Sequence, residues 1–235
     1  MPIPVEDNIK TPLYIVLAKI AALWTVANAG YFVLFPLFGY ELSYNAEPLV
    51  FAAYFLAWSL VSIFHFKDLF SALSPSQSQI WIYSALSLAC AVIVWGLLYL
   101  FSLTSVLSGP ALAPYSDILL ATQWYFLPKS IEILMQQVLI TTLVYALAVR
   151  FHTLKRVMVA YAASFGLAHI LMFFVGSPSA YAAIMTAGAL LSTFIFPRLM
   201  LRVRGGFVVA YTIHLVFYIL LAITLHTWPP PDYGA

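Results

Sequence analysis

Residues 79–102 read QIWIYSALSLACAVIVWGLLYLFS and contain no charged side chain. A helix needs about 20 apolar residues to cross the roughly 30 Å of hydrocarbon in a bilayer, so this stretch is typical of a membrane-spanning helix. The whole chain of 235 residues is 64% hydrophobic and only 8% charged, whereas soluble domains carry about 25% charged residues. This composition excludes a soluble enzyme, a nucleic-acid-binding protein and a disordered chain.

Apolar runs of this kind recur along the chain, separated by polar or proline- and glycine-containing breaks. They predict an all-α, polytopic membrane helical bundle with about seven transmembrane helices in a single domain, residues 1–235. The predicted spans are residues 13–38, 48–66, 79–102, 128–149, 156–176, 180–200 and 206–226. The apolar stretch Ile118–Phe126 is too short to cross a bilayer, and we interpret it as interfacial or re-entrant. An eighth span at this point would change the orientation of the chain.

The basic residues predict how these spans are oriented. With seven spans, eight of the lysines and arginines fall on one side of the membrane: Lys10, Lys67, Arg150, Lys155, Arg156, Arg198, Arg202 and Arg204. Only Lys129 falls on the other side, and Lys19 lies within the first span. Because cytoplasmic loops carry the excess of basic residues, we expect a cytoplasmic N-terminus and an integral protein of a bacterial inner membrane. The expected partners are the lipid bilayer and other membrane subunits, with no nucleic acid.

Among the ionisable side chains inside the predicted spans, three are candidate site residues: Glu132 in the fourth span, His169 in the fifth and His214 in the seventh. A charged side chain costs about 2.5–3.5 kcal/mol at the centre of a membrane helix, so such groups usually face the bundle interior and mark a site. A carboxylate near two imidazoles can deprotonate water and bind a developing oxyanion. Each of the three also has a companion four residues away on the same helix face: Gln136, Phe165 and Tyr218.

Glu132, His169 and His214 can form one site only if they lie at similar depths in the membrane. Counting about 1.5 Å per residue from the outer helix ends, Glu132 lies about 6 Å deep, His169 about 10 Å and His214 about 18 Å. The three therefore meet only if the last helix is tilted or displaced outward.

Three segments resemble the CPBP family, the CAAX-prenyl-protease and bacteriocin-processing intramembrane endopeptidases. They are IEILMQQVL at 131–139, FGLAH at 165–169 and HLVFY at 214–218, which resemble the family's EExxxR, FxxxH and HxxxN motifs. The resemblance covers residues 126–226 and implies a helical core that holds a glutamate-dependent peptidase site. In that site Glu132 would match the second glutamate, and His169 and His214 the two motif histidines.

The chain departs from the family pattern at three positions. Ile131 replaces the first glutamate, Gln136 the arginine and Tyr218 the asparagine. By the resemblance, the first of these changes removes the carboxylate that would act as general base, and the second removes a charge that would keep carboxylates ionised. We therefore expect a non-catalytic relative that acts as a binding, assembly or accessory subunit of a membrane complex, with Glu132, His169 and His214 in the former catalytic positions.

Other interpretations remain open for the same residues. The chain could be an active endopeptidase, or a histidine could ligate a haem or chlorophyll-type macrocycle. Glu132 could instead pair with Lys129 three residues earlier, and each histidine could simply hydrogen-bond between helices. No H-E-x-x-H motif is present, and the single cysteine, Cys90, excludes a cysteine-based metal site. We expect neither a metal nor another cofactor.

Overall fold

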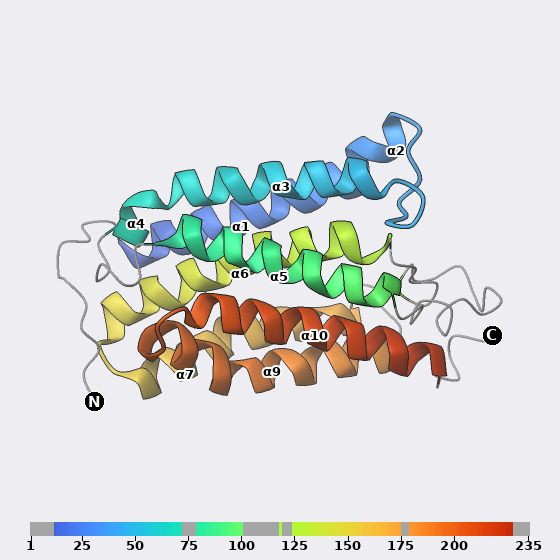
Figure 1. Cartoon of the computed structure of the whole chain (residues 1–235). Coiled ribbons are helices and arrows are strands. Elements are labelled where there is room, and N and C mark those ends of the chain that lie inside the picture. The colour runs from blue at the N-terminus through green and yellow to red at the C-terminus, as the bar shows by residue number, and fades with distance from the viewer. Residues whose placement is uncertain (1–11, 72–78, 101–117, 119–123, 175–178, 228–235) are drawn as a thin grey trace.

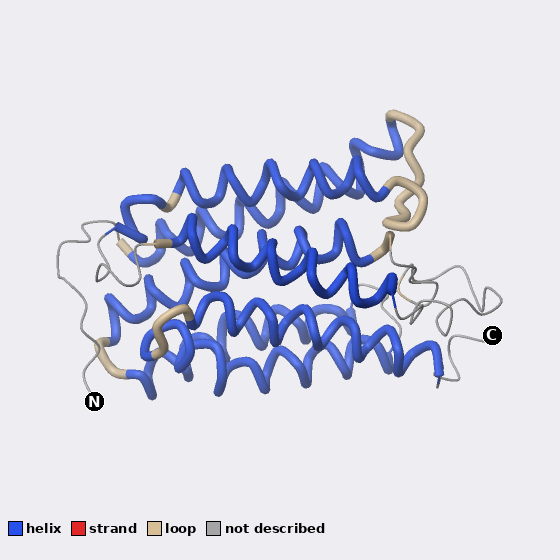
Figure 2. The backbone as a smooth tube through the Cα atoms, viewed as in Figure 1, coloured by secondary structure: helices blue, strands red, loops and turns tan. Residues whose placement is uncertain are grey.

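The computed structural model describes residues 12–71, 79–100, 118, 124–174 and 179–227, and helices form nearly all of this part of the chain (Figures 1 and 2). No β-strand occurs among these residues, which confirms the all-α fold class. The long helices are α1 (Leu13–Ala29), α3 (Pro48–His65), α5 (Ile80–Leu100), α6 (Phe126–Phe151), α9 (Ser179–Arg202) and α10 (Gly206–Thr227). The shorter segments are η1 (Gly30–Leu34), α2 (Phe35–Leu37), α4 (Lys67–Ser71), α7 (Leu154–Tyr161), η2 (Ala162–Gly166), α8 (Leu167–Ile170) and η3 (Leu171–Phe174).

Seven helical stretches in the described part of the chain are long and apolar enough to cross a membrane. The seven predicted spans are confirmed, and those of their ends that fall on described residues agree with the helix bounds to within two residues. The predicted ends at 102 and 176 lie outside the described residues. The first span joins α1, η1 and α2, and the fifth joins α7, η2, α8 and η3. The protein is therefore a polytopic integral membrane protein. Most of the stretch from 118 to 126, predicted to be interfacial or re-entrant, lies outside the described residues.

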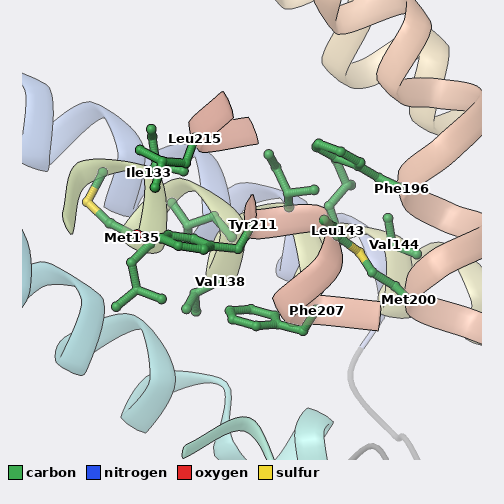
Figure 3. Packing of buried hydrophobic residues seen from close by; sticks show 14 of the residues in the cluster. Ile133, Met135, Val138, Leu143, Val144, Phe196, Met200, Phe207, Tyr211 and Leu215 are labelled. Atoms are coloured by element: carbon green, nitrogen blue, oxygen red, sulfur yellow. The ribbon is translucent and has the colours of Figure 1, made fainter. Parts of the chain in front are cut away.

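Helix α6 forms the centre of the bundle (Figure 1). Twenty of its 26 residues are buried, and it packs against α1, α3, α5, α7, α9 and α10. In Figure 3, Ile133, Met135 and Val138 of α6 lie beside Tyr211 and Leu215 of α10. Because polar side chains are costly against lipid, a helix that carries several of them is more stable inside the bundle than at its surface.

The outer faces of the surrounding helices are apolar. Large side chains such as Phe64 on α3, Val92 on α5 and Leu191 on α9 are 62–64% exposed. A soluble protein would not expose so many large apolar side chains in contiguous patches, whereas a bilayer solvates them. These faces therefore contact lipid.

The basic residues gather at one end of the bundle. Lys67 in α4, Arg150 at the end of α6 and Arg202 at the end of α9 lie where these segments reach the same end (Figure 1). This arrangement follows from the antiparallel succession of the spans, and it is the end that the sequence predicts to be cytoplasmic.

Candidate functional site

Glu132 lies in the second turn of α6, where three side chains donate hydrogen bonds to its carboxylate. Its Oε2 accepts from Lys129 Nζ at 2.7 Å and from the Tyr44 hydroxyl at 3.0 Å. Its Oε1 accepts from Gln136 Nε2 at 2.7 Å. The Lys129–Glu132 ion pair considered from the sequence is therefore present, and the Glu132 side chain is only 15% exposed. We call Glu132 and these three donors the Glu132 network.

Tyr44 reaches Glu132 from the segment between α2 and α3. Its ring packs against the aromatic rings of Tyr31, Phe51 and Tyr125, so the segment is held over the end of α6. Burial, with a further contribution from the negative charge of Glu132, raises the pKa of the Tyr44 phenol well above its ordinary value. The hydroxyl therefore stays protonated and remains a hydrogen-bond donor to Glu132.

Lys129 links the Glu132 network to α10. Its ammonium group lies 3.9 Å from the centre of the Tyr218 ring, a cation–π geometry. The Tyr218 ring in turn lies 5.5 Å from the ring of His214, with 32° between the two planes. Nearby, the Tyr211 hydroxyl donates to the Ser130 carbonyl oxygen at 3.0 Å and fixes α10 against α6. The Tyr218 ring therefore contacts both Lys129 of the Glu132 network and the ring of His214.

His169 lies in an irregular part of the fifth span. The π-helical segment η2 precedes it and the 3₁₀-helical segment η3 follows it, and π-helical turns inside helices often occur at functional sites. Its Nδ1 lies 2.9 Å from the Phe165 carbonyl oxygen, and its ring lies 4.6 Å from the Phe165 ring. A carbonyl oxygen only accepts, so Nδ1 carries the proton and Nε2 of the neutral ring keeps a free lone pair.

A cavity of about 430 Å³ lies between the fifth span, α9 and α10, and both His169 and His214 line it. The rest of the lining is almost entirely apolar. Other lining residues include Phe165, Gly188, Ser192, Phe196 and Phe217.

The structure thus brings two of the three predicted site residues to one cavity, despite the depth difference estimated for His214. Glu132 is not among the residues that line this cavity; it belongs to the Glu132 network on α6. Of the companions, Gln136 donates a hydrogen bond to Glu132, Phe165 lines the cavity, and the Tyr218 ring contacts both Lys129 and His214. Among the described residues, no three histidine, cysteine, aspartate or glutamate side chains gather where they could hold a metal ion.

Sequence reasoning missed two parts of this region. Tyr44 is 88 residues from Glu132, and no spacing rule connects a loop tyrosine to a helix glutamate at that separation. The part that α9 plays in lining the cavity was also missed. The run Ala187-Gly188-Ala189 could have indicated it, because small residues leave space between helices. The buried Gln137 makes no side-chain hydrogen bond to any described residue.

Comparison of the chain with family models, curated proteins and solved structures finds no match in any of the three.

Proposed function

We propose that this integral membrane protein has a CPBP-like helical core that has lost catalysis and serves as a binding or assembly subunit of a membrane complex. The proposal rests on the hydrogen bonds that the Glu132 carboxylate already accepts within the protein. A carboxylate offers about four lone-pair sites, and three of them already accept hydrogen bonds from Lys129, Tyr44 and Gln136. A general base must instead present a lone pair within about 2.6–3.2 Å of the water that it deprotonates.

The replaced motif positions support the same proposal. Ile131 packs against the apolar core in place of a second carboxylate. Tyr218 places its ring beneath the Lys129 ammonium group instead of offering an amide to a substrate. Both residues therefore stabilise the bundle at positions where an active peptidase of this type would have polar site residues.

The apolar outer faces support a partner within the membrane. The breaks between the spans are mostly short, so lateral contact through lipid-facing helices is the expected mode of association with other subunits. The basic end of the bundle favours an orientation with that end in the cytoplasm, and we propose the inner membrane of a bacterium as the location.

An active endopeptidase is the second candidate, because His169 and His214 share one cavity. Purified full-length protein in proteoliposomes, incubated with a library of membrane-proximal peptides, separates the two candidates. We expect no new cleavage product by mass spectrometry, and we expect the protein in mildly solubilised native membranes to migrate within a larger complex.

The decisive variant is Glu132→Gln, with Glu41→Gln as the matched control because Glu41 is an exposed carboxylate outside the spans. Cleavage by the wild-type protein that disappears in a folded Glu132→Gln variant, but persists in Glu41→Gln, would establish the peptidase and refute our proposal. Migration as a free monomer in native membranes would refute the assembly role.

A further inference from the structure

The cavity between the fifth span, α9 and α10 opens sideways toward lipid. Three residues that line it, Leu191, Ile195 and Ile213, are also 64%, 40% and 39% exposed. They belong to the apolar outer face that contacts the bilayer. A molecule dissolved in the membrane can therefore enter the cavity without crossing water.

The inner wall of the cavity combines aromatic surface with few polar groups. Phe165, Phe196 and Phe217 supply three aromatic rings. Ser192 also lines the cavity, but its hydroxyl is already engaged within the protein: it donates to the Ala189 carbonyl oxygen at 2.6 Å, and its oxygen lies 3.5 Å from the Tyr161 hydroxyl. The two imidazoles are therefore the polar groups available to fix the orientation of a ligand, as in most small-molecule pockets, where a few polar groups stand in an apolar wall.

The two imidazoles offer complementary hydrogen-bonding groups. His169 donates through Nδ1 to the Phe165 carbonyl oxygen, so its Nε2 is an acceptor. His214 has a buried Nδ1 with no hydrogen-bond partner among the described residues. Since an unpaired buried N–H is rarer than an unpaired acceptor, we assign the proton of His214 to Nε2. One ring then presents an acceptor and the other a donor.

We propose that this cavity binds a bilayer-soluble molecule with one hydroxyl group on an apolar body. The hydroxyl hydrogen would be donated to Nε2 of His169, and the hydroxyl oxygen would accept from Nε2 of His214. A hydroxyl group is the smallest group that matches this donor and acceptor pair. A long-chain alcohol and a lipid-soluble phenol share this chemistry, and the three phenylalanines can pack on either apolar body. The inference does not depend on the loss of catalysis proposed above.

Photoaffinity labelling of the full-length protein in proteoliposomes tests the proposal. The probe is a sixteen-carbon alcohol with a diazirine in its chain, and the control probe is its methyl ether, which lacks the O–H donor. We expect the alcohol to label α9 and α10 about tenfold more strongly, as expected for hydrogen bonds to a buried site. Competition by unlabelled hexadecanol or by a long-chain alkylphenol identifies which kind of hydroxyl compound binds better.

Two variants locate the site. His169→Phe keeps an aromatic ring but removes the acceptor, so the preference for the alcohol over the ether should disappear. Ala187→Trp should block the cavity, since Ala187 is exposed and lines it. Ala183→Trp, at an exposed alanine one turn earlier on α9 that does not line the cavity, is the matched control and should label as the wild-type protein does.

Three outcomes would overturn the proposal. Equal labelling of the wild-type protein by the alcohol and the ether would show that no hydroxyl group is recognised, whatever the variants do. Unchanged labelling in a folded Ala187→Trp variant would place the ligand elsewhere. A strong visible absorption band in the protein purified from its native membrane, lost in His169→Phe, would identify a macrocycle as the occupant instead.

Discussion

Lys129 and Glu132 form a largely buried ion pair at the start of α6, with side chains 9% and 15% exposed. Removing one member of such a pair leaves the other charge uncompensated, which costs about 3–5 kcal/mol. We expect Lys129→Met to lower the free energy of unfolding by about this amount, measured by denaturant titration in mixed micelles. The double variant Lys129→Met/Glu132→Gln should regain much of the loss, because neither charge remains. A double variant no more stable than Lys129→Met would contradict this account.

Tyr44 ties the segment between α2 and α3 to the same carboxylate through its hydroxyl. A hydrogen bond to a charged group contributes about 1.5–3 kcal/mol, so Tyr44→Phe should destabilise the protein by that amount in the same titration. Tyr14→Phe is the control, since Tyr14 is 71% exposed. Equal stabilities of the two variants would show that the hydroxyl of Tyr44 contributes nothing.

The contribution of Tyr44 should also depend on pH in a defined direction. Burial raises the pKa of its phenol in the folded protein, while the unfolded chain ionises near the ordinary value of about 10. As the pH rises, the phenol therefore ionises in the unfolded chain before it does so in the folded protein. The stability that Tyr44 contributes is complete below about pH 10 and declines above it. We expect the stability difference between wild-type protein and Tyr44→Phe to shrink between pH 10 and 11.5. If this stability difference instead grew between pH 10 and 11.5, the pKa of the Tyr44 phenol would be lowered, not raised, in the folded protein.

At the scale of single helices, α10 has one face toward α6 and another toward lipid. Leu215 is 1% exposed, whereas Leu220 is 57% exposed. Leu215→Ala should leave a cavity in the core and cost about 2–5 kcal/mol. Leu220→Ala should cost far less, because lipid chains fill the space that the side chain leaves. Similar losses in the two variants, measured by unfolding in mixed micelles, would show that these faces are wrongly assigned.

The helices were predictable from sequence because each span needs one long apolar run, and that property is local. Glu132, His169 and His214 could also be singled out locally, since ionisable groups are rare in hydrocarbon. Their surroundings were not predictable in the same way. The position of His169 depends on the π-helical and 3₁₀-helical turns around it, and the partnership of Glu132 with Tyr44 depends on contacts between distant parts of the chain. The cavity likewise depends on how α9 packs against α10 near Gly188, where an added Cβ would lie 2.8 Å from Cζ of Phe217.

At the scale of the whole molecule, the seven spans place Ala46 and Thr153 at opposite ends of the bundle, and both residues are exposed. The end near Thr153 also carries Arg150, Lys155 and Arg156, so the excess of basic residues predicts that this end faces the cytoplasm. In a Cys90→Ala background, a membrane-impermeant maleimide should label Ala46→Cys in intact spheroplasts. Thr153→Cys should be labelled only after the membrane is made permeable. The reverse pattern would invert the orientation, and labelling of both cysteines in intact spheroplasts would mean that the number of crossings between them is even.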